Sequence, residues 1–201
     1  MKNKMIDYYN KCLLECYSDD RVAHIIEDAL HNVQVLYDEN QDEPKATKVH
    51  TFQKIYPTIA TYQAMINLHT PKEQCIAFFD HYLSKQAKPQ ARMIQLAMKI
   101  PFLYKCMPAI FKWMTVNNFG EAAGFRAKFY DTPKTTCKFD MTRCLFYETC
   151  KRYDCTELVP CFCHVDDVTN GNMHPYIHWH RVGTIGEGYP VCDFEIDVKK
   201  D

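Results

Sequence analysis

Several features that mark other protein classes are scarce in this 201-residue sequence. It contains 6 glycines and 10 prolines, too few for a collagen-like or low-complexity chain. Its 24 basic and 25 acidic side chains give a formal charge of -1, whereas a general nucleic-acid binder carries a basic excess. Hydrophobic residues make up 47% and charged residues 24%, which excludes disorder of the chain as a whole.

Long apolar runs are also missing. No uncharged stretch approaches the ~18 residues that a membrane span needs. The longest apolar segment, 93–114, is interrupted by three lysines and two prolines. We interpret this segment as two buried helical pieces, with a helix on a membrane surface as the weaker alternative. We therefore expect neither a membrane nor a nucleic acid as a partner.

Cysteine, in contrast, is abundant, with 11 residues. The first eight residues contain no apolar segment of the kind that a secretory signal has. An odd number of cysteines in a chain of this length does not fit a small secreted scaffold held by disulfides. We therefore expect a cytoplasmic protein with reduced thiols.

The first part of the chain has the apolar spacing of helices. Apolar side chains fall three or four residues apart between Val22 and Leu36 and again between Phe52 and Ile66. From about residue 121 the period changes to the two-residue alternation of strands. The alternating segments are 125–130, 137–142, 177–182 and 192–198.

The connections between these strands complete the predicted fold. A short helix is expected over 145–154 and a long polar loop over 160–175. Helices followed by strands predict an α+β fold, in which a helical N-terminal half packs on an antiparallel sheet of about four strands. We expect the helical region 1–120 and the sheet region 121–201 to form one compact domain.

Alternation places two reactive groups at the rim of the apolar face of the sheet. Cys192 is in phase with Phe194, and Arg181 is in phase with Trp179. A two-residue turn at 186–187 would set Arg181 directly opposite Cys192.

An inward guanidinium is costly unless it meets an anion. The partner of Arg181 is either a carboxylate of the protein, such as Asp166, or the carboxylate of a bound substrate, which its forked donors suit. Periodicity alone slightly favours the protein carboxylate.

The remaining cysteines carry little signal, with one exception. No C-x-x-C pair occurs, so neither a zinc ribbon nor a thioredoxin-type redox pair is supported, and most thiols are interpreted as small buried hydrophobes. The segment 163–167 differs because a thiol, an imidazole and two carboxylates follow one another. Such a segment could bind a metal or supply a nucleophile and a base.

Five short motifs follow one another over about 139–196. They are Thr142-Arg143-Cys144, Cys163-x-x-Asp166, Arg181-x-x-Thr184, Gly188 and Cys192-Asp193-Phe194. In order and spacing this set resembles the L-2-amino-thiazoline-4-carboxylic acid hydrolases. The resemblance implies a bacterial enzyme of cysteine metabolism. It would open a 2-aminothiazoline ring at the amidine carbon and release N-carbamoyl-L-cysteine or a close analogue.

The resemblance also implies roles for particular side chains. Arg181 would bind the carboxylate of the small-molecule substrate. Either Cys192 or Cys163 would attack as a thiolate, or a water would attack after losing a proton to Asp166. A nearby arginine favours a thiolate. The other candidate contacts to the substrate are Thr184, Asp193 and Cys144. Asp193 ranks below Cys192 because alternation points it to the other face.

Two alternatives stay open. No cofactor is expected, but a divalent metal held where Cys144, Cys163, Asp166 and Cys192 converge would activate water instead. The chain would otherwise be a non-catalytic protein that binds a small carboxylate or thiol, or senses oxidation through its cysteines. The sequence does not indicate an oligomeric state.

Overall fold

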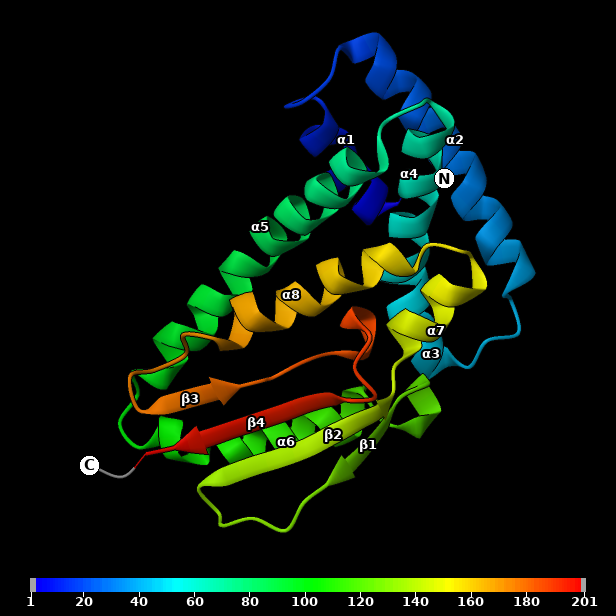
Figure 1. Ribbon diagram of the computed structural model, residues 1–201. Coiled ribbons are helices and arrows are strands. Elements are labelled where there is room, and N and C mark those ends of the chain that lie inside the picture. The colour runs from blue at the N-terminus through cyan, green and yellow to red at the C-terminus, as the bar shows by residue number, and fades with distance from the viewer. Residues whose placement is uncertain (1–2, 200–201) are drawn as a thin grey trace.

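The computed structural model describes residues 3–199 and shows helices in the first part of the chain and a sheet in the last (Figure 1). The first part contains α1 (Lys4–Leu13), α2 (Asp19–Glu39), α3 (Lys45–His50), the π-helical turn η1 (Thr51–Ile55), α4 (Tyr56–Asn67), α5 (Lys72–Met98), the 3-10 turn η2 (Leu103–Cys106), α6 (Met107–Asn118) and η3 (Glu121–Ala123). The second part contains β1 (Arg126–Phe129), β2 (Thr136–Arg143), α7 (Leu145–Arg152), η4 (Thr156–Leu158), α8 (Val159–Asn170), β3 (Ile177–His180), η5 (Ile185–Glu187) and β4 (Cys192–Val198). The predicted α+β fold is confirmed.

The apolar stripes of the helical part form its core as predicted. In α2 the buried side chains are Val22, Ile25, Ala29, Val33 and Leu36, which repeat every three or four residues. They pack against α4, which is buried on almost all sides. Because α4 lies inside, the short α3 and the turn η1 that precede it run from the surface into the core.

The sheet is antiparallel, with strand order β1-β2-β4-β3. Phe139 of β2 pairs with Phe194 of β4, and Trp179 of β3 pairs with Ile196. Phe111 of α6 packs on this apolar face, with its ring centroid 5.7 Å from those of Phe139 and Trp179. The opposite face carries the polar residues of the strands, so one face of the sheet belongs to the core.

The long polar loop expected over 160–175 is wrong. Residues 159–170 form α8, which lies between α5 and the sheet (Figure 1). Its valines, cysteines, aspartates and histidine are weak helix formers, so the sequence gives little helical signal. Contacts with α5 stabilise the helix instead: the Cys161 thiol donates to the Ile76 carbonyl at 3.6 Å, and His164 Nδ1 lies 2.7 Å from Asp80 Oδ1.

The two-residue turn expected at 186–187 is also wrong. Because Trp179 pairs with Ile196 and His180 with Glu195, the register continues with Arg181 opposite Phe194 and not opposite Cys192. The strands are joined by a longer connection that contains η5. The register differs by two residues, and side chains alternate with a period of two, so Arg181 still lies on the apolar side.

The segment 93–114 is not two buried pieces. Helix α5 continues through Pro89 to Met98, and α6 begins at Met107. Several of its large apolar side chains are exposed, among them Met93 and Phe102. Within residues 3–199, no helix is both long enough and apolar enough to cross a membrane.

Candidate functional site

Arg181, at the end of β3, lies inside the molecule and contacts α8. Its side chain is only 7% exposed. Nη2 donates to the Cys163 carbonyl oxygen at 3.1 Å and to the carboxylate of Asp167, and Nη1 lies 3.5 Å from Asp166 Oδ2. Of the two partners considered for this arginine, the carboxylates of the protein are therefore the ones in contact with it. Bonds of this kind compensate for the burial of the guanidinium.

Asp166 is half-buried where Arg181 and Lys54 approach α8, and we call this neighbourhood the Asp166 recess. Desolvation raises the pKa of its carboxyl to about 6, although the positive charges of Arg181 and Lys54 act in the opposite direction. Even so, 46% of its side-chain surface is exposed. Such a carboxyl can gain or lose a proton close to neutral pH.

Cys192, at the start of β4, has the surroundings best suited to a thiolate. It is 4% exposed, and burial raises the pKa of its thiol. Two neighbours oppose that shift: the Ile185 N–H, which donates to Sγ at 3.2 Å, and the charge of Arg181. Burial raises the pKa of both Cys163 and Cys144 to about 12. The three thiols share one neighbourhood, since the charges of Cys144 and Cys192 raise the pKa of Cys163 and the charge of Cys192 raises that of Cys144.

Thr184 and Asp193 hold the connection between β3 and β4. The Thr184 hydroxyl is fully buried, accepts from the Glu187 N–H at 3.2 Å and caps η5. The Asp193 carboxylate accepts from the backbone N–H groups of Val182 at 3.0 Å and Gly183 at 2.9 Å. Asp193 thus points away from Cys192 and fixes the backbone that follows Arg181.

The close contact between η5 and α8 depends on Gly186. A Cβ at this position would lie 2.5 Å from Cγ1 of Val159, at the start of α8, which is closer than such atoms approach in proteins. Only glycine therefore allows η5 to lie against α8. This contact keeps the Ile185 N–H directed at the sulfur of Cys192.

Lys54 is a member of this cluster that sequence reasoning missed. Burial lowers the pKa of its ammonium, and the charge of Asp166 raises it, so the two groups lie near each other. No carboxylate lies within 4.0 Å of Lys54 Nζ, and no hydrogen bond is formed by it, in the part of the chain that the structure describes. Lys54 belongs to η1, and π-helical turns are rare and often found at functional sites.

The sequence contained little to reveal Lys54. It follows Phe52 in a helical pattern, where a lysine normally marks the solvated face. The wider π-helical turn changes the direction of the side chains that follow it, and periodicity computed for an α-helix cannot show this. A lysine one position before the buried Ile55 and Tyr56 was the sole hint.

The four residues considered as ligands of a divalent metal do not converge on one point. Among residues 3–199, no three His, Cys, Asp or Glu side chains converge closely enough to hold a metal ion. Cys144, Cys163, Asp166 and Cys192 are neighbours, but they do not form a ligand set.

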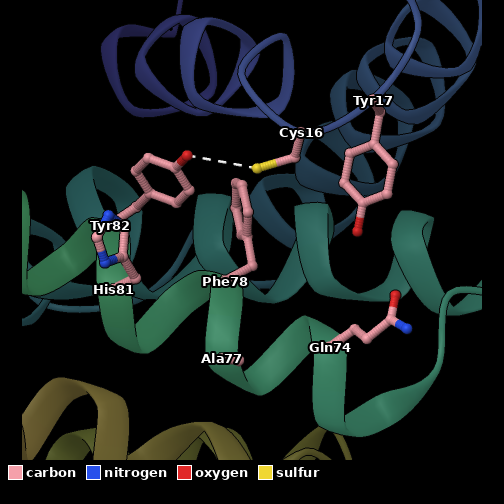
Figure 2. Close-up of a pocket in the computed structure, with 7 residues that line it drawn as sticks. All are labelled: Cys16, Tyr17, Gln74, Ala77, Phe78, His81 and Tyr82. Atoms are coloured by element: carbon pink, nitrogen blue, oxygen red, sulfur yellow. Dashed lines mark hydrogen bonds between the residues drawn. The ribbon is translucent and has the colours of Figure 1, made fainter.

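Two cavities lie elsewhere in the molecule. One, of about 310 Å³, lies between the α1–α2 turn and α5 (Figure 2). It is lined by Cys16, Tyr17, Gln74, Ala77, Phe78, His81 and Tyr82. The second, of about 460 Å³, is lined by Asn3, Lys4, Met5, Phe52, Gln53 and Gln86. Neither cavity contains a residue of the Asp166 cluster.

A buried thiol, a half-buried carboxyl and two cations thus lie near one another where β3 and β4 approach α8. The sequence profile of the L-2-amino-thiazoline-4-carboxylic acid hydrolases matches residues 48–196. The chain belongs to this family. The matched span begins before η1, so it includes Lys54 as well as the motifs of the C-terminal part. No curated protein sequence matches the chain closely enough to count as a relative.

Proposed function

We propose that this protein opens the ring of 2-aminothiazoline-4-carboxylate by hydrolysis, with Cys192 as the nucleophile and Asp166 as its base. The observation that carries the proposal is the environment of Asp166. Its pKa is raised to about 6, and its neighbours include the thiol of Cys192 and the cations Arg181 and Lys54. Family membership supports hydrolysis, and this environment supports the assignment of roles.

The overall reaction consumes one water. The amidine carbon of the ring is bonded to the ring sulfur, the ring nitrogen and an exocyclic amino group. Water supplies an oxygen to this carbon, the carbon–sulfur bond breaks, and the sulfur leaves as a thiol. The product is N-carbamoyl-L-cysteine, and both nitrogens are retained. The reaction needs an anchor for the carboxylate, a nucleophile for the carbon and a proton donor for the departing sulfur.

Lys54 is the group that we assign to the substrate carboxylate. Both nitrogens Nη1 and Nη2 of Arg181 already face oxygens of α8, namely those of Cys163, Asp166 and Asp167. A second carboxylate there would have to displace a protein contact. Among residues 3–199 no carboxylate pairs with Lys54, so a bound carboxylate would compensate its desolvated charge. Arg181 then serves to hold Asp166.

The chemical steps use Cys192 and Asp166 in turn. Asp166 accepts the thiol proton, and the resulting thiolate, which the Ile185 N–H stabilises, adds to the amidine carbon. The ring sulfur leaves with the proton from Asp166, which gives an open-chain isothiourea on Cys192. Asp166 then takes a proton from water, the hydroxide adds to the same carbon, and Cys192 leaves as a thiolate.

The other candidates act around these groups. We assign Thr184 and Asp193 to positioning, because they hold the connection that carries Arg181 and Ile185. Cys163 and Cys144 would line the recess, since burial keeps both thiols protonated at neutral pH.

The experiment is incubation of the protein with 2-aminothiazoline-4-carboxylate and detection of N-carbamoylcysteine by liquid chromatography with mass spectrometry. Intact-mass measurement after rapid acid quench should show one substrate mass added to the wild-type protein, on the peptide that contains Cys192. Cys192→Ala should abolish both signals. Cys161→Ala is the control, because this buried thiol belongs to α8 but faces α5.

Three results would change this proposal. Turnover that survives in Cys192→Ala but not in Asp166→Asn would mean that water attacks directly. Saturable binding without product would indicate a protein that only binds small carboxylates. Neither binding nor product would reject this substrate.

A further inference from the structure

The second half of α5 has two apolar faces. One face is buried, with Ala87, Ala91 and Met98 packed into the interior. On another side of the helix, Met93 and Leu96 are exposed and lie three residues apart, and Ile100, two residues after the helix ends, is also exposed. We call these three residues the stripe. The most exposed of the three is Met93, at 68%. This stripe is therefore not explained by packing within the molecule.

The stripe continues into the turn that leads to α6. Phe102 is 71% exposed, and its backbone has φ 68°, in the left-handed region that a phenylalanine rarely adopts. The ammonium of Lys105 lies 5.3 Å from the centroid of its ring. A strained residue that presents an aromatic ring to solvent suggests a function outside the core.

The charge of this part of the chain has one sign. From 81 to 120 the sequence contains no aspartate or glutamate and six basic residues, in a chain whose formal charge is -1. Lys85 pairs with Glu15. The other five have no carboxylate within 4.0 Å in residues 3–199. These five are Lys88, Arg92, Lys99, Lys105 and Lys112, and all are exposed.

We propose that this surface, which we call the α5–α6 corner, binds the surface of an anionic lipid bilayer. The corner comprises the exposed apolar residues Met93, Leu96, Ile100 and Phe102 and the basic residues Lys88, Arg92, Lys99 and Lys105. Leucine and phenylalanine beside lysine and arginine are typical of segments that lie in a membrane interface. Anionic headgroups would neutralise the basic side chains while the apolar side chains enter the interface.

A second copy of this chain fits the corner less well. A two-fold symmetric contact would bring the corner onto itself and place the unpaired basic groups of both copies together. A bilayer supplies opposite charge and an apolar interior at once. The corner lies at the end of the sheet where β4 finishes, away from η5 (Figure 1).

The test is co-sedimentation of the full-length protein with vesicles, at low and high salt. One set of vesicles is phosphatidylcholine alone and the other contains about 30 mol% phosphatidylserine. We expect binding to the anionic vesicles that weakens with salt. Lys99→Glu with Lys105→Glu should weaken it about 100-fold, and Leu96→Ser with Phe102→Ser about 30-fold.

The matched controls change the same residue types on α3. Val49→Ser and Lys45→Glu alter an exposed apolar and an exposed basic side chain, and both should bind vesicles as the wild type does. All substituted positions are exposed, so the variants should fold, which circular dichroism would check. Turnover of 2-aminothiazoline-4-carboxylate is measured in parallel, so failure of this proposal is distinguishable from failure of the proposed function.

Three outcomes would overturn the proposal. The first is no binding to either kind of vesicle. The second is binding that survives Leu96→Ser with Phe102→Ser, which would mean nonspecific attraction between charges. The third is self-association of the wild type that the corner variants abolish, which would assign the corner to contacts between copies.

Discussion

The Asp166 recess and the surroundings of the cavity in Figure 2 contain similar residue types, but the pKa of the carboxyl group is shifted in opposite directions. In the recess, Cys192 and Asp166 lie near Lys54. Next to the cavity, which Cys16 lines, the hydroxyl of the lining residue Tyr82 donates to Glu15, and Glu15 pairs with Lys85. Beside the cavity, Lys85 lies 3.1 Å from Glu15 in solvent, and its hydrogen bond lowers the pKa of the Glu15 carboxyl. In the recess, desolvation outweighs the cations and raises the pKa of Asp166 to about 6. The surroundings of each carboxyl group, and not the residue types beside it, therefore decide whether its pKa is raised or lowered.

This difference separates a carboxylate that pairs from a carboxyl that transfers protons. A general base is most effective when its pKa lies near the working pH. Glu15 stays ionised at neutral pH, whereas Asp166 can take up and release a proton there. The comparison supports our proposal that the chemistry takes place at Asp166, and four measurements test it.

The largest expected effect is that of removing the recessed carboxyl. Asp166→Asn should lower kcat/KM for ring opening by about 10³-fold, because the thiol of Cys192 and the attacking water lose their base. Glu15→Gln, the matched change beside the cavity, should stay within about twofold of the wild type. Steady-state assays of product formation would check both. Equal losses of kcat/KM in the two variants would show that Asp166 and Glu15 do not differ in their role in catalysis.

The second effect concerns the reactivity of the two cysteines. Cys16 is exposed, whereas Cys192 is 4% exposed and has a raised thiol pKa. Iodoacetamide should therefore alkylate Cys16 about 100-fold faster than Cys192 in the free protein. Peptide mass spectrometry over a time course gives both rates. Faster alkylation of Cys192 would show that its thiol is already ionised and needs no base.

Much of the fold could be predicted because its signals are local. The three-to-four-residue spacing of apolar residues in α2 predicts its buried face, and the alternation in β2 and β4 predicts the buried face of the sheet. The helix α8 could not be predicted, because its composition opposes a helix and its stability comes from contacts with α5. The exposure of Met93 could not be predicted either, since burial depends on tertiary packing.

The candidate site was accessible to sequence reasoning only where it lies on strands. Alternation correctly placed Arg181 and Cys192 on one side of the sheet, even though the predicted turn was wrong, because a shift of two residues preserves the face. Lys54 lies more than 100 residues before Asp166 in the sequence. Its approach to the recess depends on a π-helical turn that periodicity does not detect.

The third effect tests which cation binds the substrate. Lys54→Met should raise KM by about 30-fold and change kcat little, because it removes a charge-assisted contact to the carboxylate. Lys85→Met, which removes the lysine beside the cavity, should leave both constants unchanged. Steady-state kinetics would separate KM from kcat. An unchanged KM in Lys54→Met would mean that Lys54 does not bind the substrate carboxylate, and Arg181 would again be the candidate.

The smallest effect is on the pH dependence. Asp166 acts as a base only when ionised, so kcat/KM should be constant above pH 6 and fall about tenfold per pH unit below it. Because the charge of Lys54 lowers the pKa of Asp166, Lys54→Met should move the midpoint to higher pH. Lys85→Met should leave it in place, since Lys85 acts on Glu15. A midpoint near 4 in the wild type would show that the recess does not desolvate Asp166, and the contrast with Glu15 would then lose its physical basis.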